Sequence, residues 1–140
     1  MQIRDLVEED FPHIHTHEAV DKAIEILTET PYSSLPVFNA EGQFVGELSQ
    51  ERLLLEIVGY EEGGDGDFDF DMIRNALSEN SKTIDPMVDK HQLTLQVDET
   101  VKQAASLMYE EDISTLPIFD DATFVGILSD IAILQHYKDI

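Results

Sequence analysis

The sequence predicts an α+β fold in which two β-α-β-β-α repeats are related by pseudo-two-fold symmetry. Three observations lead to this prediction: an internal period of 81 residues, the same order of elements in both copies, and copies too small to bury both faces of a sheet alone. Ser-Ser-Leu-Pro-Val-Phe at 33–38 matches Ser-Thr-Leu-Pro-Ile-Phe at 114–119. Phe-Val-Gly-Glu-Leu-Ser at 44–49 matches Phe-Val-Gly-Ile-Leu-Ser at 124–129.

Hydrophobic periodicity assigns the elements in chain order. The first copy is predicted to contain an extended segment, a helix with apolar residues at helical spacing, two strands and a final helix, at 12–16, 19–27, 35–38, 44–48 and 50–58. The second copy repeats this order at 93–97, 101–108, 116–119, 124–128 and 130–137. Asp98 suits the N-cap of the first helix of its copy, and His17 occupies the matching place in the other.

The domain boundaries follow from the same alignment. Repeat 1 is expected at 1–60 and repeat 2 at 82–140, with an acidic linker and a short helix (72–78) at 61–81 between them. The alternating aspartates of the linker resemble the opening of a calcium loop, but Phe70 stands where that loop needs glycine. An acidic linker is therefore the favoured interpretation.

Composition excludes several classes of protein. Thirty acidic residues against eight basic ones give a net charge of −22, which argues against nucleic-acid binding and against docking on anionic lipid. The chain contains no cysteine, so disulfides, thiolate metal sites and a cysteine nucleophile are excluded. No apolar run reaches the length of a membrane span and no signal-peptide pattern opens the chain, so we expect a cytoplasmic protein without membrane insertion. No catalytic motif is found, and we expect a protein that is not an enzyme.

The repeat, its element order, the Leu-Pro-Val-Phe and Leu-Pro-Ile-Phe strands and the Val-Gly-x-Leu-Ser segments resemble a tandem cystathionine-β-synthase (CBS) domain pair, also called a Bateman module. The resemblance covers nearly the whole chain. It implies a regulatory module that senses a small molecule, such as AMP, ADP, ATP or S-adenosylmethionine, in a cleft between the repeats. It also implies a homodimer and a regulated enzyme or transporter as partner.

In that family a Gly-x-x-Ser/Thr-x-x-Asp motif contributes to the nucleotide site. Gly46 with Ser49, and Gly126 with Ser129, match its beginning, but Arg52 and Ala132 stand where the ribose-binding aspartate is expected. The serines can equally be plain helix N-caps, and Arg52 can bind a phosphate or pair with Glu47 or Glu51. Resemblance places a first group of ligand residues at His15, Thr16, Tyr32, Ser34, Pro36, Ser49 and Arg52. A second group follows at Gln96, Val97, Ile113, Thr115, Pro117 and Ser129.

Two other functions remain open. His13, His15 and His17 alternate, so that an extended strand would present them on one side as ligands for Zn²⁺, although exposed polar strand positions explain them equally well. The acidity is compatible with a sensor of a divalent cation (Mg²⁺, Ca²⁺ or Zn²⁺). A protein-interaction domain without a ligand is the other alternative.

The last helix of each copy predicts an assembly. Leu53, Leu54 and Leu55 span too wide an arc for one helix face to bury inside so small a domain. Ile131 and Leu134 extend the same feature to the second copy. An apolar patch left on a monomer is typical of an interface, so we expect a homodimer.

Overall fold

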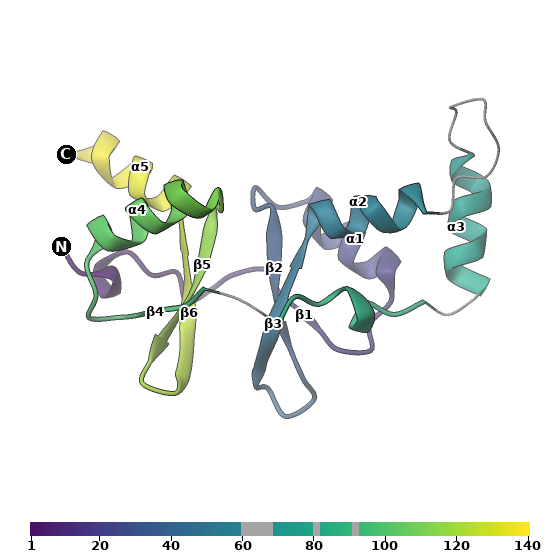
Figure 1. Ribbon diagram of the computed structural model, residues 1–140, viewed down its shortest axis with the longest axis horizontal. Coiled ribbons are helices and arrows are strands. Elements are labelled where there is room, and N and C mark those ends of the chain that lie inside the picture. Colours follow the sequence, from purple (N-terminus) through teal and green to yellow (C-terminus); the bar gives the residue numbers. More distant parts are fainter. Residues whose placement is uncertain (60–68, 80–81, 91–92) are drawn as a thin grey trace. The chain divides into compact units, whose positions relative to one another are not determined.

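The computed structural model describes residues 1–59, 69–79, 82–90 and 93–140, which form two compact units (Figure 1). The central unit consists of residues 13–90. The terminal unit combines residues 1–12 with residues 91–140. The aspartates of the acidic linker before Asp69 lie outside the described residues.

The central unit contains a three-stranded sheet with strand order β1-β2-β3. Its elements are β1 (Ile14–His15), α1 (Val20–Thr28), β2 (Ser34–Phe38), β3 (Phe44–Ser49), α2 (Gln50–Val58), α3 (Phe70–Glu79) and the 3-10 helix η2 (Asp85–Met87). β1 is parallel to β2, and β2 is antiparallel to β3. Helices α1 and α2 lie on the same side of this sheet in Figure 1, so one sheet face is covered by helices.

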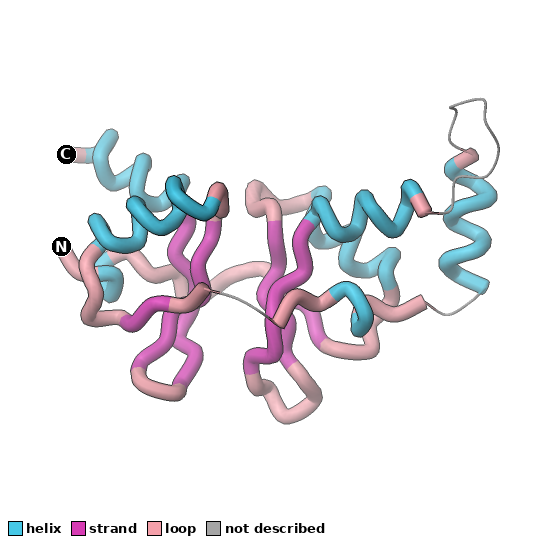
Figure 2. Tube along the Cα trace, in the orientation of Figure 1, coloured by secondary structure: helices cyan, strands magenta, loops and turns pink. Residues whose placement is uncertain are grey.

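The terminal unit repeats this plan with strand order β4-β5-β6. Its elements are η1 (Ile3–Asp5), β4 (Leu95–Gln96), α4 (Val101–Glu111), β5 (Thr115–Asp120), β6 (Thr123–Ser129) and α5 (Asp130–Asp139). Both units contain helices and strands in the predicted β-α-β-β-α order (Figure 2). The predicted α+β class and repeat are therefore confirmed.

Alternating side chains along the strands explain which sheet face the helices cover. Leu35 and Val37 of β2 and Leu48 of β3 are fully buried in the core of the central unit, where α1 and α3 also contribute. The other face of the sheet carries Ser34 and Pro36. The residues predicted to bind a ligand on the strands therefore belong to the face that the helices do not cover.

Each repeat's leading segment packs in the unit that contains the other repeat's sheet. Ile3 is fully buried and belongs to the core of the terminal unit, together with Leu116 and Leu128. Ile84 and Met87 belong to the core of the central unit. As a division of the sequence, the boundaries 1–60, 61–81 and 82–140 stay a prediction.

The predicted N-caps of the first helices are wrong. The caps are Ala19 and Thr100, because a turn follows β1 and β4 and delays each helix by two residues. Thr100 accepts a hydrogen bond from the backbone N–H of Gln103 (3.1 Å) in a capping box, whereas Ala19 has no capping side chain. None of the described helices is long and apolar enough to span a membrane.

Candidate functional site

Ser49 and Ser129 begin the last helices of the two units as N-caps. Ser49 Oγ accepts a hydrogen bond from the backbone N–H of Arg52 (3.0 Å), and Ser129 Oγ accepts one from that of Ala132 (3.1 Å). Both serines end a strand and are register partners of the residue that begins the preceding strand, Ser34 and Thr115. The N-cap interpretation of both serines is therefore confirmed.

The two glycines of the motif make room for the chain's own backbone. A β-carbon on Gly46 would lie 2.5 Å from the carbonyl oxygen of Asp89, and one on Gly126 would overlap the carbonyl oxygen of Glu8. Glu47 and Asp89 exchange two backbone hydrogen bonds (2.8 and 3.1 Å), and Glu8 and Ile127 do the same (2.8 and 3.0 Å). The glycines thus allow the segments at Glu8 and Asp89 to dock on β6 and β3.

A carboxylate lies beside Ser129 as a result. Ser129 is buried, and its hydroxyl donates a hydrogen bond to Glu8 Oε1 (3.2 Å). In the central unit the docked residue is Asp89, next to Glu47 on β3. Burial, and then repulsion from Asp89, raises the pKa of the Glu47 carboxyl to about 7.

The sequence prediction missed Glu8, Glu47 and Asp89, although the period of 81 residues carries the signal. Glu8 and Asp89 are acidic at equivalent positions of the two copies. Glu47 is aligned with Ile127, so a carboxylate stands where the other copy buries an apolar side chain.

The predicted ligand residues of the central unit fall into two groups along β2. Ser34 and Ser49 pair at one end of β2, close to the start of α2. His15 pairs with Phe38 at the other end, and the backbone N–H of Thr16 donates to the carbonyl of Phe38 (2.9 Å). The two ends of β2 are four residue steps apart, which is about 13 Å.

The remaining residues of the first group lie near Ser34 and Ser49. Tyr32 precedes β2, Pro36 is the register partner of Glu47, and Arg52 is in the first turn of α2. The guanidinium of Arg52 pairs with Glu56 one turn further along (3.4 Å), rather than with Glu47 or Glu51 as the sequence suggested. The i, i+4 spacing brings Glu56 onto the same helix face.

The second group is divided in the same way. Thr115 and Ser129 pair at one end of β5, Pro117 follows on the same strand face, and Ile113 precedes β5. Gln96 pairs with Phe119 at the other end, where its side chain binds the backbone of Asp121. Val97 follows Gln96 and is buried in the core.

The three histidines predicted as metal ligands meet different partners. The rings of His13 and His15 pack edge to face (5.3 Å between centroids), and His13 also packs against Phe38. His17 has a φ of 70° and directs Nδ1 to Asp85 (2.6 Å), whose other carboxylate oxygen accepts from the His17 backbone N–H. Among the described residues, no group of three or more His, Asp or Glu side chains is placed to hold a metal ion.

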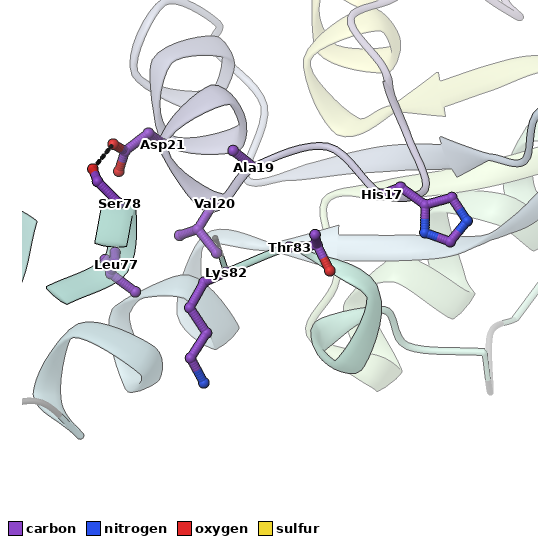
Figure 3. A pocket seen from close by; sticks show the side chains of 8 residues that line it. All are labelled: His17, Ala19, Val20, Asp21, Leu77, Ser78, Lys82 and Thr83. Carbon is purple, nitrogen blue, oxygen red and sulfur yellow. Dashed lines mark hydrogen bonds between the residues drawn. The ribbon is translucent and has the colours of Figure 1, made fainter. Parts of the chain in front are cut away.

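A cavity of about 410 Å³ lies elsewhere in the central unit. Its lining comes from the start of α1, the end of α3 and the segment at Lys82 and Thr83 (Figure 3). Ser78 of α3 donates a hydrogen bond to Asp21 of α1 on one side of it (3.4 Å, Figure 3). His17, one of the predicted metal ligands, lines this cavity, but neither it nor a cavity of about 370 Å³ in the terminal unit is lined by a residue predicted to bind an adenosyl ligand.

The family model named CBS domain matches the sequence twice, at residues 3–59 and 83–139. This chain belongs to the CBS domain family. Its two matched segments form a CBS domain pair, as the sequence predicted.

Solved structures share the fold of this CBS pair. CBSX2 in complex with AMP is 22% identical, with a TM-score of 0.74 over 99% of this chain and 96% of that one. The CBS domain pair of protein MJ0100, in complex with 5-methylthioadenosine and S-adenosyl-L-methionine, is 23% identical, with a TM-score of 0.69 over 99% and 97%. An A-adding tRNA nucleotidyltransferase of Aquifex aeolicus (strain VF5) is 24% identical over 139 residues, and this chain spans only 15% of that enzyme.

Proposed function

We propose that this CBS pair is a regulatory module, without catalytic activity of its own, that binds a small adenosyl ligand. The observation that carries the proposal is the presence of two CBS repeats, because similar pairs were solved with AMP and with S-adenosyl-L-methionine. The ligand would lie on the sheet faces that the helices do not cover, near Ser34 and Ser49 in the central unit and near Thr115 and Ser129 in the terminal unit, where Thr115 and Ser129 are buried (6% and 1% exposed). Proline and aliphatic side chains of the strands would contact the faces of a purine.

Calorimetry with a panel of AMP, ADP, ATP, adenosine, methylthioadenosine and S-adenosylmethionine tests this function. Binding of at least one member, with a rise in melting temperature that grows with ligand concentration, is expected. No heat and no melting shift from any member would exclude the adenosyl function. Native mass spectrometry of freshly purified protein provides an independent measurement, because a retained ligand adds its mass.

The regulated partner is proposed to be an enzyme or transporter, and the module itself is proposed to be a homodimer in the cytoplasm. Exposed apolar side chains on the last helices support the dimer: Leu54 is 58% exposed, Leu55 60% and Leu134 61%. Removal of such side chains from water is the ordinary driving force of association.

A divalent-cation sensor is the second candidate, favoured by the adjacent Glu47 and Asp89 carboxylates of the central unit. A hard cation such as Mg²⁺ or Ca²⁺ prefers oxygen ligands of this kind. Melting curves with Mg²⁺, Ca²⁺ or Zn²⁺, with and without EDTA, test it. Specific stabilisation survives in high monovalent salt, whereas charge screening is reproduced by that salt.

A further inference from the structure

The position of Glu8 in the terminal unit is set by backbone contacts. Its N–H donates to the carbonyl of Ile127 (2.8 Å), and the N–H of Ile127 donates back (3.0 Å). The absence of a β-carbon at Gly126 is required for this approach. Glu8 is therefore held beside Ile127 of β6, which precedes Ser129 by two residues.

The side chain of Glu8 lies at the start of α5. Ser129 Oγ, on a residue that is 1% exposed, donates to Glu8 Oε1 (3.2 Å). The N-terminus of a ten-residue helix attracts anions because its first N–H groups and the helix dipole point there. Here the Glu8 carboxylate already accepts the hydrogen bond of the Ser129 hydroxyl, which would otherwise be available to such an anion.

The first backbone donors of α5 are also engaged within the terminal unit. The N–H of Asp130 donates to the carbonyl of Ser114 (2.9 Å), and that of Ile131 to Asp130 Oδ1 (2.7 Å). The N–H of Ala132 donates to Ser129 Oγ (3.1 Å). A phosphate arriving at this helix would meet satisfied donors and two carboxylates, those of Glu8 and Asp130.

We propose that Glu8 is a specificity-determining residue, which excludes phosphate groups from the terminal unit and restricts its site to uncharged or cationic adenosyl ligands. The inference rests on the proposed adenosyl function and names the ligand class of the same site. In the central unit Asp89 has the same backbone relationship to β3, with Glu47 beside it.

Calorimetry of the full chain with AMP, inorganic phosphate and adenosine tests the role of Glu8. Glu8→Ala should bind AMP at least tenfold more tightly than the wild type does, and its affinity for adenosine should change less than threefold. Glu9→Ala is the matched control, since Glu9 is an exposed neighbour and its loss changes the net charge equally. Glu8→Gln, which keeps a hydrogen-bond acceptor for Ser129, is the second variant if Glu8→Ala unfolds.

The proposal is overturned if Glu8→Ala, or Glu8→Gln in its place, binds AMP and phosphate no more tightly than Glu9→Ala does. It is also overturned if the wild type prefers AMP to adenosine. Adenosine binding by the wild type with no gain of AMP binding in the variant leaves the adenosyl function intact and removes only the role of Glu8. If the wild type binds no adenosyl compound but the variant gains phosphate binding, the adenosyl function is excluded and the exclusion of phosphate by Glu8 is retained.

Discussion

The carbonyl group of Glu8 occupies the space where a β-carbon on Gly126 would lie. The two residues are far apart in the sequence, yet they pack within one compact unit. The same relationship joins Asp89 to Gly46 in the other unit. The glycine of each Val-Gly-x-Leu-Ser segment therefore serves the attachment of a leading segment.

Gly126→Ala should destabilise the protein by more than about 2 kcal/mol, because the β-carbon meets backbone atoms that cannot rotate away. Gly59→Ala is the matched control: position 59 has helical backbone angles, and a β-carbon there makes only ordinary contacts of 3.4 and 3.5 Å. Urea unfolding measures both variants. Equal stability of the two would contradict the close packing at position 126.

Glu47 should make the protein less stable as pH rises from about 4.5 to 7. Burial raises its pKa to about 7 in the folded state, above the ordinary value of 4.5, so the folded state holds the proton more tightly and loses this advantage as the pH increases. The change is on the order of 2 to 3 kcal/mol. Urea unfolding at pH 5 and pH 8 should show a smaller loss of stability for Glu47→Gln than for the wild type.

Glu51→Gln is the control for this pH dependence. Glu51 is exposed on α2, and its replacement removes the same charge. Its stability should follow that of the wild type at both pH values. Glu47→Ile, which copies Ile127 of the other repeat, should be more stable than the wild type at pH 8. If the unfolding free energy of Glu47→Gln falls between pH 5 and pH 8 as much as that of the wild type, Glu47 does not titrate near pH 7.

Ser129→Ala should cost more stability than Ser49→Ala. Both changes remove an N-cap, which costs about 1 kcal/mol. Ser129 is also buried and donates to Glu8, so its loss leaves a carboxylate oxygen without this donor and adds about 1 kcal/mol more. Thermal or urea unfolding compares the two, and a larger loss for Ser49→Ala would contradict the Ser129–Glu8 contact.

Leu54→Glu should dissociate the proposed dimer without unfolding the monomer, because Leu54 is 58% exposed whereas its neighbour Leu53 is buried. Light scattering at low and high salt gives the mass. The wild-type dimer should tighten as salt screens the repulsion between two subunits of charge −22. Tyr109→Glu, at an exposed position of α4, is the control for added charge and should stay dimeric. A wild-type monomer at both salt concentrations would refute the assembly.

The sequence alone predicted the repeat, the order of elements and the N-cap serines. These features depend on local information: helical and strand periodicity, turn residues and a hydroxyl before a helix. Helix α2 begins and ends where its apolar pattern predicted, at Gln50 and Val58. The predicted caps His17 and Asp98 were wrong because both residues lie in the turn before the helix, which periodicity does not detect.

The tertiary structure decided which leading segment packs with which sheet. Ile3 and Ile84 occupy equivalent places in the two copies, so either could fill either core, and the apolar pattern does not distinguish the two arrangements. Packing attached Ile3 to the terminal unit and thereby carried Glu8 to Ser129. The acidic character of the candidate site follows from that long-range pairing, because a carboxylate and a hydroxyl 121 residues apart interact only once the chain has folded.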